Sequence, residues 1–296
     1  MEDMLKKYWK GKEIVKYNYS NLKKLGVLEQ DANLLSKCGL PKSAAPYLNF
    51  EVDKVQEKEK DYYNIGFTGS GDFICLEKAA GRVVYLDHEE EDEKAVLINS
   101  SLTALLESIF CYRKFVDKVN ETGMWNYLNN NYSIRQVHEL EEELKKIDAA
   151  ALEGNTFFAG ELANRYLGVM ERIGLLEWYE PAVEEEIVLA EKKIGHAIPK
   201  VYKLLLHVTD GAYVDDLALY SVEEIVEAYK QIGFEKCAPE YLSIGSNNGK
   251  TELLIKAEQD ACQVAFLEVD FIGKQEPKEW FYFEEWLETG CKIEKE

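Results

Sequence analysis

The chain has 296 residues, of which 46% are apolar and 30% charged, a balance typical of a folded globular protein. This length suits one large domain or two modules of about 100–150 residues each. Lysine and arginine number 35 against 55 aspartates and glutamates, and the resulting net charge of −20 argues against nucleic acid and anionic lipid as partners. Such a charge attracts basic proteins, although many cytosolic proteins are acidic for solubility alone.

No apolar run approaches the roughly 20 residues needed to span a bilayer. The first residues, Met1 to Trp9, lack the basic-then-apolar order and the cleavage site of a secretion signal. We therefore expect a cytoplasmic protein without a membrane partner. The six cysteines form no CxxC or other close pair, so in a reducing compartment we expect free thiols buried in the core.

The N-terminal half is expected to begin with a polar segment, a short helix and a meander of strands. The helix covers about residues 29–38, because Gly39 suits the position after a helix and Pro41 cannot continue one. Four runs bounded by turn residues then predict antiparallel strands, at 62–67, 72–77, 82–86 and 95–98.

Two helices are expected to follow these strands. Asn99 or Ser100 can cap the first helix, whose apolar residues recur at helical spacing from Leu102 to Phe115. The second helix, about residues 133–152, is richer in charge and closes this half.

A further helical pattern at residues 161–181 separates the two halves of the chain. It suits either a rigid connector or the first helix of a second module. We place the boundary near residue 163, which gives domains at 1–163 and 164–296, with cores at about 20–163 and 183–290. The first domain carries a net charge of −7 and the second −13.

The C-terminal half is expected to mix helices and strands in the same way. One helix is expected at 183–194, another begins near Pro199, and Ser221 to Glu224 form a capping-box pattern that opens a third. An Asn248-Gly249 turn separates two of the strands. The strands are expected at 217–220, 241–244, 252–255 and 263–267, and a last helix at 283–289.

The two halves share a spacing that predicts a common origin. Ile65-Gly66 and Ile244-Gly245 each end a first central strand, and Val84 and Val264 follow those isoleucines by 19 and 20 residues. Helices then open 18 and 19 residues further on, at Leu102 and Phe283. Three matching positions in the same order favour duplication or fusion of one ancestral unit. The fold class is therefore expected to be α+β, as two tandem modules that each pack helices on a mostly antiparallel sheet.

The sequence holds no pattern typical of a catalytic, metal or cofactor site. The four histidines form no HExxH pattern and lie at no metal-ligand spacing from a cysteine. The glycines of residues 66–71 lack the Gly-Lys-Ser/Thr ending of a phosphate loop and precede a strand, so we interpret them as a hairpin or bulge glycine cluster. The sequence thus predicts no enzyme, no bound metal and no cofactor.

Two acidic groups and one tryptophan are candidates for contacting a partner. Five consecutive acids at residues 89–93 lack the ligand spacing of an EF-hand, which leaves a solvated turn or a contact for a basic partner. The same alternatives apply to three aspartates after the helix that begins near Pro199, while an exposed tryptophan can anchor an interface. The candidate residues are Glu89, Glu90, Glu91, Asp92, Asp210, Asp215, Asp216 and Trp280.

From Glu186 to Gly211 the sequence has an acidic helix, then Ile198-Pro199-Lys200-Val201-Tyr202, a leucine run and Asp210-Gly211. In this order these motifs resemble the SUKH superfamily, which includes yeast cell-wall glucan-synthesis regulators and many bacterial immunity proteins. The resemblance extends over about residues 183–290. One departure is Asp210-Gly211-Ala212, where the family more often has Asn-Gly-Gly.

The N-terminal half is similar to another SUKH subfamily that is also associated with immunity. The similarity covers about residues 20–163, and its motifs are Cys38-Gly39-Leu40-Pro41, Ile65-Gly66, Ile74-Cys75-Leu76, the run from Gly81 to His88, the run from Ile98 to Leu102, and Asp148 to Leu152.

These resemblances imply a fold without catalytic residues that neutralises a co-encoded toxin, often a nuclease, by direct binding. An acidic inhibitor can occupy the positive groove in which a nuclease holds phosphates. The leading hypothesis is a cytoplasmic immunity protein whose partner is a cognate, basic toxin, with the oligomeric state left open. A non-catalytic scaffold or cell-wall-related regulator, and an enzyme acting through the Gly66–Asp72 loop, are the alternatives.

Overall fold

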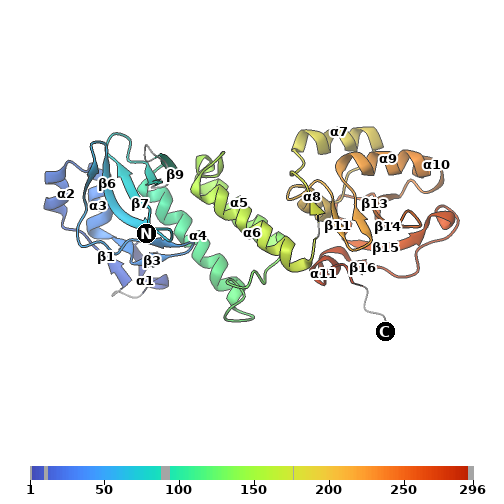
Figure 1. Cartoon of the computed structure of the whole chain (residues 1–296), viewed down its shortest axis with the longest axis horizontal. Helices are drawn as coiled ribbons and strands as arrows, with labels where there is room; N and C mark the ends of the chain where they lie inside the picture. The colour runs from blue at the N-terminus through green and yellow to red at the C-terminus, as the bar shows by residue number, and fades with distance from the viewer. Residues whose placement is uncertain (1, 10–12, 88–93, 176, 293–296) are drawn as a thin grey trace. The chain divides into compact units, whose positions relative to one another are not determined.

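The computed structural model describes residues 2–9, 13–87, 94–175 and 177–292 (Figure 1). Its contacts divide the chain into two compact units, Met1–Tyr132 with Gln136–Arg165 and Ser133–Arg135 with Tyr166–Glu296. The chain passes from one unit to the other within helix α6 (Phe157–Ile173), which also contains the expected boundary near residue 163. Both units combine helices with antiparallel sheet, so the expected fold class is confirmed.

The first unit is built on a seven-stranded antiparallel sheet in the order β3-β4-β6-β7-β8-β9, with β5 paired to β6 beside that path. Its strands are β3 (Ser43–Ala44), β4 (Leu48–Asn49), β5 (Gln56–Glu59), β6 (Tyr62–Thr68), β7 (Phe73–Glu77), β8 (Val83–Leu86) and β9 (Ala95–Asn99). A separate pair joins β1 (Ile14–Val15) to β2 (Leu40–Pro41). The four longest consecutive strands, β6 to β9, are the meander that the sequence predicted.

Helices surround this sheet and supply much of its core. They are α1 (Glu2–Tyr8), α2 (Tyr19–Leu25), α3 (Glu29–Lys37), α4 (Leu102–Asn120), α5 (Ile134–Ile147), the 3₁₀ turn η2 (Ala149–Leu152) and the first part of α6. Along α4, Leu102, Leu105 and Ile109 are fully buried because they recur on one helical face. Gly39 ends the helical path after α3, as expected, because it takes a positive φ of +82°. Its N–H donates to the carbonyl of Leu34 at 3.0 Å.

The second unit is a seven-stranded antiparallel sheet in simple chain order from β10 to β16. Its strands are β10 (Glu177–Trp178), β11 (Ala212–Val214), β12 (Leu217–Leu219), β13 (Tyr241–Asn247), β14 (Thr251–Lys256), β15 (Gln263–Glu268) and β16 (Phe281–Tyr282). Its helices are α7 (Glu184–Ile194), α8 (Lys200–Leu206), α9 (Val222–Ile232), α10 (Phe234–Cys237), the 3₁₀ turn η3 (Val269–Phe271) and α11 (Phe283–Glu288). Helices α7 and α9 lie side by side, and α9 contacts β13 (Figure 1). Ser221 caps α9 with the predicted capping box, since its hydroxyl accepts from the Glu224 N–H at 3.2 Å.

The two sheets share a detail that supports the predicted repeat. Both β6 and β13 carry a β-bulge, between Asn64 and Gly66 and between Ser243 and Gly245. At each bulge glycine a neighbouring strand comes so close that a Cβ on Gly66 or Gly245 would stand 2.4 or 2.5 Å from a backbone oxygen. Helices also begin at Leu102 and Phe283, as the spacing predicted.

The register of the ladders corrects one pair in that alignment. Asn64 pairs with Cys75, and Cys75 with Val84. The matching row of the second sheet runs from Ser243 through Leu254 to Ala265. Counted from the bulge, Val84 therefore corresponds to Ala265, and the predicted match of Val84 to Val264 is wrong by one residue.

Two helix boundaries differ from the sequence expectation. Ser101, not Asn99 or Ser100, caps α4, because its hydroxyl accepts from the Ala104 N–H at 3.1 Å. Helix α6 ends at Ile173 instead of reaching residue 181, since Gly174 takes a positive φ of +78° and the edge strand β10 follows.

The expectation of buried cysteines is only partly met. All six cysteines are free, but Cys75 alone is buried. Cys38, Cys111 and Cys291 are half-buried, and Cys237 and Cys262 are exposed. Apolar neighbours in sequence did not ensure burial, because on helices and at strand ends such neighbours face different directions.

Candidate partner-binding surface

The predicted acidic contacts fall in three different surroundings. Glu89, Glu90, Glu91 and Asp92 lie outside the described residues. Asp210 is half-buried, and its Oδ1 accepts a hydrogen bond from the Val222 N–H at 2.7 Å, at the first turn of α9. Burial raises the pKa of this carboxyl. Asp210 thus helps to start a helix, a role that the sequence did not reveal, and its contact with a partner stays a prediction.

Asp215 and Asp216 form the tip of the hairpin between β11 and β12, and both are exposed. Asp215 takes a positive φ of +50°, a conformation in which a short polar side chain is tolerated better than a branched one. The two carboxylates therefore project from a tight turn into solvent. This is the setting in which they could meet a basic partner.

Exposed aromatic side chains lie on the strands beside this turn. Trp178, Tyr179 and Tyr213 are 38%, 50% and 39% exposed. Sheet pairing places Glu177 of β10 opposite Tyr213 of β11, so the two side chains share one face. Trp178 pairs with Ala212, so its side chain points to the opposite face of the sheet. We call Glu177, Tyr179, Tyr213, Asp215 and Asp216 the edge surface, since β10 is the outermost strand of its sheet.

The edge surface is acidic around its aromatic residues. Desolvation raises the pKa of Tyr179, and the nearby Glu177, Tyr213 and Glu224 raise it further. These groups therefore lie near the Tyr179 hydroxyl. The backbone here is fixed, because the Tyr179 N–H donates to the Thr209 hydroxyl at 2.8 Å and the Asp210 N–H to the Glu180 carbonyl at 3.2 Å. The aromatic residues are therefore presented on ordered backbone next to carboxylates.

Sequence reasoning missed these aromatic residues. Trp178 and Tyr179 lay within the segment expected to be helical, and Tyr213 stood alone between the two predicted acidic positions. The available signal was Gly174, whose position after an apolar helical pattern is typical of a helix end. Only strand pairing brings Tyr213 next to residues that are more than thirty positions away.

The predicted anchor Trp280 is half-buried. It stacks on Tyr241 with ring centroids 5.9 Å apart and an interplanar angle of 28°. The hydroxyl of Tyr241 donates in turn to Glu276. Part of the indole is thus used in packing within the second unit, and its role in an interface stays a prediction.

The Gly66–Asp72 loop is a hairpin connection closed by its own side chains. The carboxylate of Asp72 is 5% exposed and accepts from the Thr68 hydroxyl at 2.8 Å and the Ser70 hydroxyl at 2.6 Å. These bonds stabilise the turn between β6 and β7, as the hairpin interpretation expected. Among the described residues no group of histidine, cysteine and acidic side chains is arranged to hold a metal ion.

No helix in the described ranges is both long and apolar enough to cross a membrane. Comparison with protein families gives two matches. Residues 2–159 match the family described as SUKH-4 immunity protein, and residues 181–289 match the SMI1 / KNR4 family (SUKH-1). None of the curated proteins compared with the chain matches it significantly.

Proposed function

Because the chain belongs to the SUKH superfamily, with a SUKH-4 immunity domain followed by a SUKH-1 domain, we propose that it neutralises a basic, nuclease-type toxin by binding it in the cytoplasm. The immunity-type role follows from the match to the SUKH-4 immunity protein family. The kind of toxin, the compartment and the surface used are the proposal.

The edge surface is the observation that carries this proposal. Tryptophan and tyrosine are enriched among the hot spots of protein interfaces, since they bury a large area at a small cost in side-chain entropy. Here Tyr179 and Tyr213 stand exposed beside Glu177, Asp215 and Asp216. An aromatic centre with a carboxylate rim suits a partner with apolar pockets among lysines and arginines.

The charge of the whole chain supports the same kind of partner. A nuclease domain needs a positive surface for phosphates, and a net charge of −20 speeds its encounter with the inhibitor. Steering of this kind weakens as salt is added, because the Debye length falls to about 8 Å at physiological ionic strength. We expect the association rate to drop with salt more than the dissociation rate rises.

Co-expression with the toxin domain encoded by the neighbouring gene tests the proposal. The chain should restore growth, and the purified pair should form a stable complex. Failure of both would refute the proposed function. Tyr179→Ala and Tyr213→Ala should each weaken binding about tenfold or more, the usual size of an interface hot spot.

Tyr282→Ala is the matched control for these variants. Tyr282 is 51% exposed and lies on β16, the opposite edge of the same sheet. Its removal should leave affinity within about twofold of the original, as is usual for residues outside a hot spot. Equal losses from both edges would mean that the edge surface has no special role.

A second candidate function is a non-catalytic scaffold or cell-wall-related regulator. The match of residues 181–289 to the SMI1 / KNR4 family favours it. A gene with no toxin-encoding neighbour, together with a cell-wall defect on deletion, would support this alternative. Toxin-dependent rescue of growth would count against it.

A further inference from the structure

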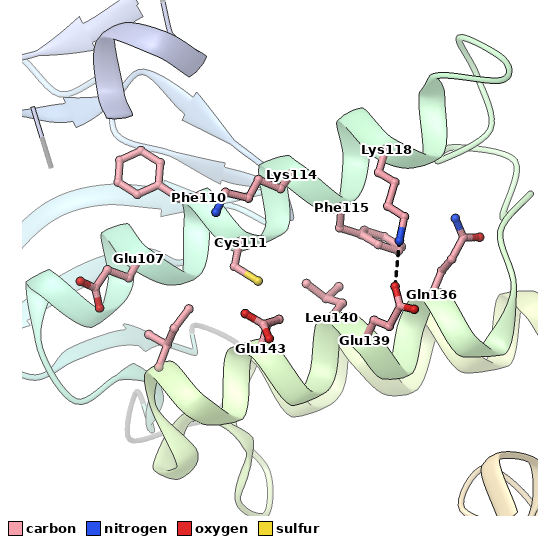
Figure 2. A pocket seen from close by; sticks show the side chains of 11 residues that line it. Glu107, Phe110, Cys111, Lys114, Phe115, Lys118, Gln136, Glu139, Leu140 and Glu143 are labelled. Atoms are coloured by element: carbon pink, nitrogen blue, oxygen red, sulfur yellow. Dashed lines mark hydrogen bonds and ion pairs between the residues drawn. The ribbon is translucent and has the colours of Figure 1, made fainter. Parts of the chain in front are cut away.

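An open groove runs between α4 and α5 in the first unit, with a volume of about 390 Å³ (Figure 2). Phe110, Phe115 and Leu140 form an apolar floor and are almost fully buried. Cys111 and Ile147 are half-buried and add apolar surface at the mouth. This volume lies in the range of sites that enclose a small ligand or a few side chains.

The lining residues are spaced along α4 and α5 in the way that allows two helices to receive a third helix between them. Along α4 the groove is lined by Glu107, Cys111, Lys114 and Lys118, at steps of four, three and four residues. Along α5 it is lined by Gln136, Leu140, Glu143 and Ile147, at the same steps. Steps of three and four keep side chains on one helical face and form the holes that receive knobs from a packed helix.

The length of these two stripes sets the size of the occupant. Each stripe spans eleven residue steps, and at 1.5 Å per residue this is about 16 Å, or three helical turns. The helices are antiparallel, since Lys118 near the end of α4 pairs with Glu139 near the start of α5 at 2.8 Å (Figure 2). A single helix of about three turns would therefore fill the groove.

The charges at the mouth define the polar side of that occupant. Glu107 forms no ion pair within the part of the chain that the structure describes, and it stands at the end opposite the Lys118–Glu139 pair. Glu143 and Lys114 line the groove between the two ends, and Lys146 already pairs with Glu143 at 2.7 Å. A lysine or arginine on the occupant would therefore meet Glu107, and an acidic residue would meet Lys114.

Exposed apolar side chains lie on the segment that connects α4 to α5, beyond Lys118 and before Gln136. The connection between α4 and α5 carries Met124, Trp125 and Leu128, which are 71%, 59% and 58% exposed. These are the three most exposed large apolar residues among those described. Side chains of this kind on a connection are typical of an interaction site, because isolated exposure in water brings no stability.

We propose that the α4–α5 groove, together with Trp125 on the connection between these helices, is a second docking site that takes an amphipathic helix of the toxin with a basic residue at the Glu107 end. This inference rests on the proposed function, because it assigns part of the same partner to a different domain. The helix places its apolar stripe over Cys111 and Leu140 and its basic residue near Glu107. Binding at two surfaces of one toxin would raise the overall affinity above that of either surface.

The test uses the full chain and the catalytically inactivated toxin domain encoded by the neighbouring gene. Cys111→Trp places an indole in the groove, and we expect the affinity to fall about thirtyfold, since the helix loses an apolar contact of one or two side chains. Trp125→Ala should cost about tenfold, and Glu107→Lys about threefold through like-charge repulsion. The control is Lys145→Trp, which adds the same indole at an exposed position of α5 that does not line the groove.

Three results would overturn the inference, and they are distinguishable. Normal toxin binding by all three variants (Cys111→Trp, Trp125→Ala and Glu107→Lys) would refute the groove as a docking site but leave the proposed function intact. A dimer of the free chain that Cys111→Trp dissociates, seen by light scattering, would show that a second copy fills the groove. Absence of toxin binding by the unaltered chain would refute the proposed function and the groove together.

If Cys111→Trp fails to fold, the two surface variants decide the question. Trp125 and Glu107 are both exposed, so their replacement leaves the core unchanged. Hydrogen exchange of the unaltered complex adds a direct measurement, because a docked helix should slow exchange in residues 107–118 and 136–147. Unchanged exchange in both segments would contradict docking.

Discussion

Replacing Asp148 with alanine is expected to destabilise the first unit by about 3 kcal/mol. Asp148 lies between α5 and η2, is 8% exposed, and binds the junction of β9 and α4. Its Oδ2 accepts from the Ser100 N–H at 2.6 Å and from the Asn99 amide at 3.1 Å, and its Oδ1 accepts from the Ser100 hydroxyl at 2.8 Å. One carboxylate thus joins segments 48 residues apart.

The magnitude follows from what these donors lose. A hydrogen bond to a charged group contributes roughly 1.5–3 kcal/mol, and a buried donor left alone costs about as much. Asn99 is fully buried, so its amide would keep only the bond to Ser108. Ser100 is exposed, so water can replace part of its loss. The expected total is therefore nearer the value of one strong bond than the sum of three.

Native-state hydrogen exchange can measure this change for each unit separately. Protection should fall in β6 to β8 of the first unit and stay unchanged in β13 to β15 of the second. Ser101→Ala is the control, since it removes a single cap bond and should cost about 1 kcal/mol. A loss below that of the control, or an equal loss in both sheets, would refute the reasoning.

Three further predictions concern other buried or exposed groups. Burial raises the pKa of Asp31 to about 6. The stabilising contribution of this carboxyl is therefore present below its usual pKa and is lost as pH rises toward 6. Urea unfolding should show that Asp31→Asn stabilises the first unit by roughly 1–3 kcal/mol at pH 7 and by nothing at pH 4. Gly245→Ala should cost about 2–4 kcal/mol, because its methyl group would stand 2.5 Å from the Ala218 carbonyl oxygen, and an unchanged melting temperature would contradict this. Thiol titration of the folded chain should modify the exposed Cys237 and Cys262 first, and the buried Cys75 only on unfolding. Cys111 should react slowly, because burial raises the pKa of its thiol to about 11. Rapid labelling of Cys111 would contradict this prediction.

The central strands and several helix ends could be predicted because their signals are local. The strands within residues 62–86 are short, mainly apolar runs separated by turn residues, so adjacent strands pair in the simplest way. The capping box at Ser221 and the glycine stop at Gly39 likewise use contacts within a few residues. Such signals need no knowledge of the rest of the chain.

Other features depend on contacts between distant segments and were predicted wrongly or missed. Asn99 has the chemistry of a helix cap, but the structure uses its amide to bind Asp148, and Ser101 caps α4 instead. The two-residue strands β1 to β4 and β10 carry too little sequence to be recognised alone. They form because tertiary packing brings their backbone donors and acceptors together, and such groups need hydrogen-bond partners when they are removed from water.

The sequence by itself determined the net charge, the α+β class, the two-module plan and the family resemblance, all of which follow from composition, local periodicity and motif spacing. The tertiary structure alone decided which side chains share a surface. Glu177 meets Tyr213 because β10 pairs with β11, and Cys111 faces Leu140 because α4 and α5 pack antiparallel. Strand register and helix packing choose such neighbours through the burial of the whole core, which no local stretch of sequence contains.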